Sequence, residues 1–97
     1  MNTVRELQEW YAAKCDGDWE HSYGVRIESL DNPGWLLRID LTGTELEEVE
    51  FEPIVRDDGK GGWANMRIQE HTWQAACGPR DLDASISIFL EWIRHLR

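Results

Sequence analysis

The stretch YGVRIESLDNPGWLLRIDL, residues 23–41, decides the fold that the sequence predicts. Apolar and charged side chains alternate on both sides of the tetrapeptide DNPG, residues 31–34, which is a strong turn signal. A period of two places alternate side chains on opposite faces of a strand, so the stretch predicts an antiparallel hairpin with one apolar and one polar face. The apolar face holds Tyr23, Val25, Ile27, Ser29, Trp35, Leu37, Ile39 and Leu41, and the polar face holds Arg26, Glu28, Arg38 and Asp40.

Three further strands are predicted after this hairpin. Glutamates alternate with apolar side chains over residues 48–52, which predicts a third strand with an acidic face. Pro53 cannot donate a ladder hydrogen bond, so this strand should lie at an edge or end there. The alternation at residues 63–69 predicts a fourth strand and that at residues 73–77 a short fifth, before Gly78 and Pro79 end the sheet.

Amphipathic helices are predicted at both ends of the chain. Thr3 and Glu6 form a capping box for a helix that ends near Lys14, and a second helix begins near Asp81. The order α-β-β-β-β-β-α predicts one domain over residues 1–97, a two-layer α+β sandwich in which both helices cover one face of an antiparallel meander. The expected buried stripes are Val4, Leu7 and Tyr11 with Trp10 beside them, and Leu82, Ile86, Phe89, Leu90 and Ile93 with Ile88 and Trp92 beside them.

Charge is unevenly distributed along the 97 residues, whose net charge is −9. Residues 15–58 carry 13 acidic side chains against three arginines, a net of −10, and the rest of the chain is close to neutral. Nucleic acids and anionic membranes attract basic surfaces, so both are disfavoured as partners. A concentrated acidic field would instead speed association with a basic protein, although it also serves solubility alone.

The cellular location expected from the sequence is cytoplasmic. No apolar run approaches the roughly 20 residues of a membrane span, and the N-terminal residues lack an apolar signal-peptide core. Cys15 and Cys77 are far apart in the sequence and form no CxxC motif, so both are expected to be free thiols.

The densest cluster of polar chemistry is CDGDWEHSYG, residues 15–24. Asp16, Asp18 and Glu20 alternate as at the start of a calcium loop, but His21 stands where that loop needs glycine and Ile27 where it needs glutamate. Zinc ligation by Cys15 and His21 together with His71 and Cys77 matches no usual spacing. No third group that would orient a nucleophile is visible beside Cys15 and His21. We therefore expect no cofactor and no metal, with a small metal-dependent or thiol enzyme built on this cluster as the alternative.

The six tryptophans fall into two groups. Four lie on predicted core faces: Trp10, Trp35, Trp73 and Trp92. Trp19 lies in the turn after the first helix, and Trp63 falls on the strand face opposite Met66 and Ile68. An exposed tryptophan beside carboxylates is typical of an interface anchor, whereas the alternatives are that Trp63 packs under a loop and that Trp19 and His21 brace the helix–strand junction.

Several blocks of the sequence resemble the immunity protein 53 family. They are CDGDWEH at residues 15–21, YGV at 23–25, LDNPGW at 30–35 and IDL at 39–41, with LQEWY near the N-terminus and the stretch from GP at 78–79 to FLEW at 89–92. The resemblance covers nearly the whole chain and is weakest over residues 57–76. It implies a small α+β protein of a bacterial polymorphic-toxin system that neutralises a cognate toxin by binding it.

The residues and the resemblance together predict a stoichiometric, non-covalent toxin inhibitor that is not an enzyme and is a monomer or weak dimer. The acidic field suits a toxin with a basic substrate cleft, such as a nuclease. A general protein-interaction or small-molecule-binding domain is a further alternative. The predicted contact residues are Asp18, Trp19, Glu20, Glu48, Glu50, Glu52 and Trp63.

Overall fold

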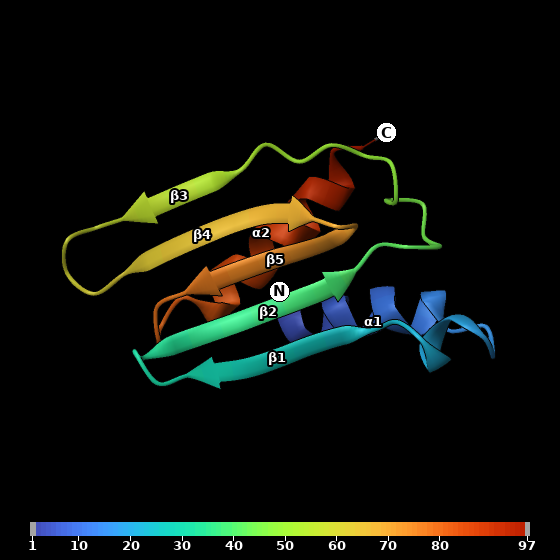
Figure 1. Cartoon of the computed structure of the whole chain (residues 1–97), viewed down its shortest axis with the longest axis horizontal. Coiled ribbons are helices and arrows are strands. Elements are labelled where there is room, and N and C mark those ends of the chain that lie inside the picture. The colour runs from blue at the N-terminus through green and yellow to red at the C-terminus, as the bar shows by residue number, and fades with distance from the viewer. Residues whose placement is uncertain (1, 97) are drawn as a thin grey trace.

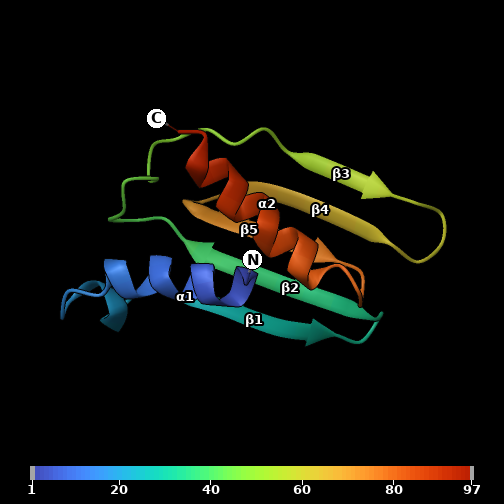
Figure 2. The same cartoon turned by 180° about the vertical axis from the view of Figure 1, so that it is seen from behind.

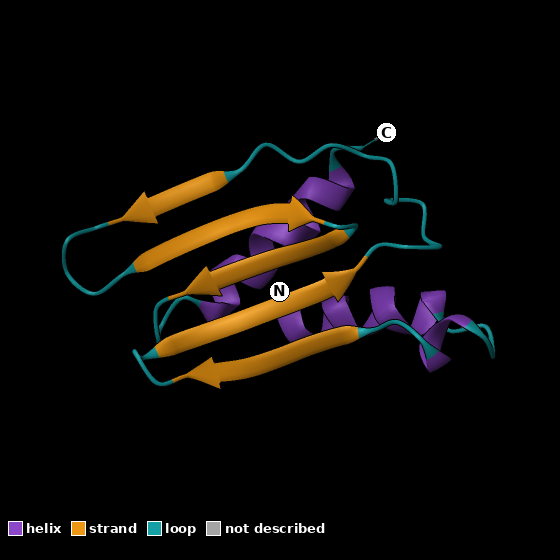
Figure 3. Ribbon diagram, viewed as in Figure 1, coloured by secondary structure: helices purple, strands orange, loops and turns teal. Residues whose placement is uncertain are grey.

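A computed structural model describes residues 2–96 and shows two layers, a sheet with both helices on one face (Figures 1 and 2). The predicted α+β sandwich and its element order are therefore confirmed, and Figure 3 separates the two kinds of element by colour. The elements are α1 Thr3–Lys14, η1 Trp19–His21, β1 Val25–Leu30, β2 Gly34–Asp40, β3 Ile54–Asp57, β4 Trp63–Gln69, β5 Thr72–Cys77 and α2 Leu82–Arg94.

The sheet has the strand order β1-β2-β5-β4-β3, with every neighbouring pair antiparallel. This order departs from a simple meander at one point, because β2 is followed in the sheet by β5 rather than by β3. Residues 41–53 carry the chain across one end of the sheet to its far edge (Figure 1). As a result β5 is central, and β1 and β3 are the two edge strands.

The core lies between the sheet and the helices. The three central strands contribute every second side chain to it, and α2 contributes one apolar stripe, as the sequence predicts. All four tryptophans that were expected on core faces belong to this cluster or pack against it. Its fully or almost fully buried members include Leu37, Ile39, Met66, Trp73, Ala75, Ile86 and Phe89.

The opposite face of the sheet carries charged side chains on β1 and β2, as predicted. Arg26 lies 3.8 Å from Asp40 and Arg38 lies 3.9 Å from Glu28, each pair joining neighbouring strands. Cross-strand pairs of opposite charge stabilise a sheet modestly, by about 0.2–1 kcal/mol each.

The third strand predicted over residues 48–52 is wrong, because β3 is Ile54–Asp57. In β3 and β4, Ile54 lies opposite Met66 and Asp57 opposite Trp63. Continued in the same register, residues 51 and 52 would still face Gln69 and Ile68 of β4, and only residues 48–50 would lie beyond its end. Pro53 removes a ladder donor just before β3, so the glutamate-rich stretch leaves the sheet there and does not extend β3.

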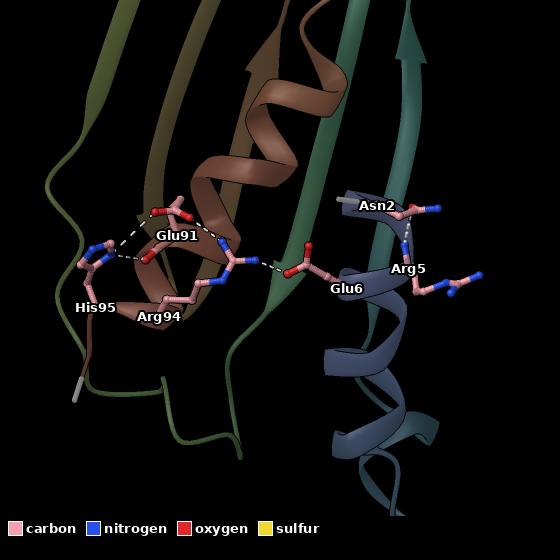
Figure 4. A network of polar contacts seen from close by, with 6 residues as sticks. All are labelled: Asn2, Arg5, Glu6, Glu91, Arg94 and His95. Carbon is pink, nitrogen blue, oxygen red and sulfur yellow. Dashed lines mark hydrogen bonds and ion pairs between the residues drawn. The ribbon is translucent and has the colours of Figure 1, made fainter.

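Helix α1 begins one residue earlier than the predicted capping box implies. The cap is Asn2, whose side-chain oxygen accepts a hydrogen bond from the Arg5 N–H at 2.9 Å (Figure 4). Thr3, predicted as the cap, is instead buried in the first turn, and its hydroxyl donates to Asp83 of α2.

The buried face of α1 also differs from the prediction. Thr3 and Leu7 are buried and Trp10 is half-buried, whereas Val4 is 62% exposed and Tyr11 is 36% exposed. The helix is thus turned by about one residue relative to the expected stripe, because Thr3 and Trp10 take the places against α2 and the sheet.

An ionic link joins the two helices. The Arg94 guanidinium near the end of α2 lies between Glu91 of its own helix and Glu6 of α1 (Figure 4). The guanidinium donates hydrogen bonds to Glu91 and to Glu6, and these bonds, with Glu91 the larger contributor, raise the pKa of Arg94 further above its ordinary value. Among the described residues, no helix has the length and apolar character needed to cross a membrane.

Candidate functional site

Three connecting segments meet at the end of the sheet where β2 ends and β5 begins (Figure 1). They are residues 15–24, residues 41–53 and the β4–β5 turn. The Leu41 N–H donates to the His71 carbonyl at 2.8 Å, which joins the second segment to the turn. We call this region the acidic end, defined by the carboxylates of Asp16, Asp18, Glu20, Glu45, Glu47, Glu48, Glu50, Glu52 and Glu70.

The first segment is a turn held by its own carboxylates. Gly17 has a φ of +91°, and the Glu20 carboxylate accepts hydrogen bonds from the N–H groups of Asp16 and Gly17 at 3.0 and 2.8 Å. One Asp16 oxygen accepts from the N–H groups of Asp18 and Trp19, both at 2.9 Å. The bond from the Trp19 N–H, followed by that from Asp18, lowers the pKa of Asp16, and backbone donors led by its own N–H lower the pKa of Glu20.

Trp19 ties the first segment to the second. Its side chain is only 7% exposed, and its Nε1–H donates to the Thr42 carbonyl at 2.8 Å. Its ring contacts Trp10, Tyr11 and Tyr23, with centroid distances of 6.3, 6.0 and 6.2 Å. These contacts support the alternative reading in which Trp19 braces the helix–strand junction.

Further bonds fix the second segment to the helices. Lys14 at the end of α1 pairs with Glu45; burial alone would raise the pKa of that carboxyl, but the hydrogen bond from Lys14 helps to lower it. The Glu50 carbonyl accepts from Trp92 Nε1 at 3.2 Å. Phe51 packs edge-on against Trp92 at 5.3 Å, and Leu46 is buried at 1% exposure. The side chains of Leu46 and Phe51 therefore pack toward the core, and those of Glu48, Glu50 and Glu52 remain exposed to solvent.

The structure brings most of the predicted contact residues together and leaves one apart. Asp18 and Glu20 from the first segment lie at the same end as Glu48, Glu50 and Glu52 from the second. Their contact with a partner stays a prediction. Trp63 begins β4 at the other end of the sheet, half-buried beside Gly34 and Gly78, and its N–H donates to Asp81 at 3.0 Å.

Four acidic residues of this region were not among the predicted contacts: Asp16, Glu45, Glu47 and Glu70. Glu45 and Glu47 belong to the same glutamate-rich run as Glu48, so charge density alone could have included them. Glu70 could not be placed without the strand order. It forms the β4–β5 turn with His71, and both have left-handed φ angles, +52° and +61°.

Among residues 2–96, few side chains could act as a nucleophile or as ligands of a metal ion. The Cys15 thiol donates to the Tyr11 carbonyl at 3.4 Å, so it is engaged with its own helix. Glu47, Glu48 and His71 can each offer one donor atom to a cation, with these atoms within 4.8 Å of one another. Glu48 is 86% exposed and lies 3.9 Å from His71, an arrangement that surface ion pairs commonly adopt.

Taken together, these features define a small acidic α+β protein in which nine of the 19 acidic residues lie in three segments at one end of the sheet. The chain belongs to the immunity protein 53 family, which it matches over residues 4–94. No curated protein and no solved structure matches it significantly.

Proposed function

We propose that this protein is an immunity protein that binds a cognate bacterial toxin and neutralises it in a stoichiometric, non-covalent complex. Family membership supports the toxin-neutralising role, since immunity proteins act by binding rather than by catalysis. The complex would form in the cytoplasm of the cell that makes the toxin and of its kin.

The observation that carries the mechanism is the joining of two acidic segments, distant in sequence, by the Trp19–Thr42 hydrogen bond and the Lys14–Glu45 pair. Of the carboxylates at this end, Glu45 pairs with Lys14, while Asp16 and Glu20 are bonded to backbone N–H groups. A field of one sign at one end attracts and orients a partner of the opposite sign. We infer that the toxin presents a basic surface, as a nuclease does at its substrate cleft.

Kinetics of binding to the product of a toxin gene found beside this protein's own gene test this proposal. The double variant Glu48→Lys with Glu50→Lys is expected to lower the association rate at low salt by about ten-fold or more, because steering contributes factors of 10 to 10³. The effect should shrink as added salt shortens the screening length to about 8 Å at physiological ionic strength.

The matched control is Glu28→Lys with Asp31→Lys. It changes the net charge by the same amount, but Glu28 lies on β1 and Asp31 in the β1–β2 turn at the opposite end of the sheet. An equal loss of association rate in both doubles would show that net charge, not the acidic end, matters. Absence of any complex with the wild-type protein would overturn the proposed function itself.

A further inference from the structure

A groove of about 530 Å³ lies between α1 and the start of β1. In Figure 2 these two elements run side by side along the lower border of the molecule. The residues that line it and matter here are Val4, Leu7 and Tyr11 of α1, Tyr23 and Val25 at the entry to β1, and Glu20 of the turn.

Exposed apolar side chains gather along this groove. Val4, Tyr11 and Tyr23 are 62%, 36% and 38% exposed, and Ile27, next along the same face of β1, is 44% exposed. Of the large apolar side chains exposed among residues 2–96, only Val55 and Leu96 lie elsewhere. Contiguous apolar surface of this kind on a small protein commonly marks an interaction site.

The fold explains why the groove stays open. Ile27 lies opposite Leu37, which is fully buried, so its side chain points to the helix side of the sheet. The helix there, α1, turns Leu7 and Trp10 toward the core and leaves Val4 and Tyr11 at the groove. Because β1 is an edge strand, no further strand shields these side chains.

The groove opens onto the acidic end. Glu20 lines it, with its carboxylate accepting from the N–H groups of Asp16 and Gly17, and Asp18 belongs to the same turn; neither forms an ion pair among the described residues. His21 and Arg26 also line the groove, and Arg26 Nη1 lies 3.8 Å from Asp40 Oδ2. Glu20 and Asp18 thus place negative charge at the end of the groove that adjoins the acidic end.

We propose that this groove receives a segment of the cognate toxin that presents an apolar anchor side chain flanked by lysine or arginine. The inference rests on the proposed function and names the surface that would carry most of the binding energy. The apolar walls bury the anchor, and the carboxylates at the mouth pair with the basic neighbours. A buried apolar anchor inside a charged rim is the arrangement in which a few residues dominate affinity.

Equilibrium binding of the same toxin-gene product tests the groove. Val4→Ser with Ile27→Ser removes two exposed apolar side chains without changing charge, and Val55→Ser is the matched control, because Val55 is 75% exposed on the opposite edge strand. We expect the double variant to raise the Kd at least ten-fold and to keep the salt dependence of the wild type, while the control binds as the wild type does.

Each outcome decides between the two proposals. If the groove double variant binds with wild-type affinity while the acidic-end variant loses association rate, the groove is not the docking site and the proposed function stands. If the wild type forms no complex, both proposals are wrong. Should the double variant fail to fold, hydrogen exchange of the wild-type complex replaces it: slower exchange of the β1 amides on binding supports the groove, and unchanged exchange overturns it.

Discussion

Replacement of Trp19 by alanine should be among the most damaging single substitutions outside the central core. The ring is 93% removed from solvent (7% exposed), packs among Trp10, Tyr11 and Tyr23, and donates one hydrogen bond to Thr42. Its loss removes both the packing of the junction and the bond between the two acidic segments.

The size of the effect follows from these contacts. A tryptophan buries about 150–250 Å², and truncation of a buried aromatic residue to alanine costs about 3–5 kcal/mol. Trp19→Phe keeps most of the ring packing and loses the bond to the Thr42 carbonyl, so it should cost about 1 kcal/mol. Because 1 kcal/mol lowers the Tm of a domain of this size by about 4–8 °C, the alanine variant should melt at least about 12 °C below the wild type.

Urea denaturation followed by far-UV circular dichroism measures both variants, since this signal does not depend on the tryptophan that is removed. Trp63→Ala is the matched comparison, because Trp63 is only half-buried at the other end of the sheet and should cost less. A free energy of unfolding for Trp19→Ala within 1 kcal/mol of the wild type would refute the view that Trp19 braces the junction.

Three further predictions concern titration, close packing and thiol access. The pKa values of Asp16 and Glu20 are lowered in the folded state, so the unfolded chain binds more protons and the Tm should fall as the pH drops from about 5. The double variant Asp16→Asn with Glu20→Gln should show a smaller fall of Tm with pH, and an unchanged slope would contradict this. Gly34→Ala places a Cβ 2.2 Å from the Cys77 carbonyl oxygen, so the backbone of β2 must shift. This shift should lower the free energy of unfolding, measured in urea, by about 1–3 kcal/mol, whereas an unchanged value would show that β2 moves without cost. A thiol reagent such as DTNB should label Cys15 in the native protein and Cys77 only after unfolding, because burial shields the Cys77 thiol and raises its pKa. Equal labelling rates for the two thiols in the native protein would contradict this prediction.

The sequence predicts the layers of the fold well because both helices and four of the five strands carry a clear period. It fails at residues 48–52, where alternation of glutamate with Val49 and Phe51 is that of a strand. In the structure this segment pairs with no strand, yet its side chains still alternate between half-buried and exposed. Phe51 packs on Trp73 and Trp92, while the glutamates face solvent. A period of two reports burial on one side and says nothing of whether a partner strand is present.

The sequence predicts the residue types of the acidic end and part of their arrangement. Asp18 and Glu48 are 30 positions apart, but the antiparallel β1–β2 hairpin alone brings the segment before β1 and the segment after β2 to one end. Only the strand order, with β5 beside β2, adds the β4–β5 turn and Glu70 to them. The groove was missed because Val4 and Tyr11 were expected to be buried. Helical spacing fits either Val4 or Thr3 as the start of the buried stripe, and the contact of Thr3 with Asp83 of α2 is a tertiary interaction that no local pattern contains.

The ties within the acidic end have a consequence for the thermodynamics of association. A binding surface built from loops normally loses conformational entropy on docking, at about 0.5–1.5 kcal/mol for each side chain that becomes immobile. Here the backbone of both loops is already fixed by Trp19, Lys14 and Trp92 before any partner arrives. Because these loops are fixed in advance, more of the interaction free energy remains as affinity. A substitution that removes one of these fixing contacts should therefore shorten the lifetime of the complex, even where the substituted residue does not touch the partner.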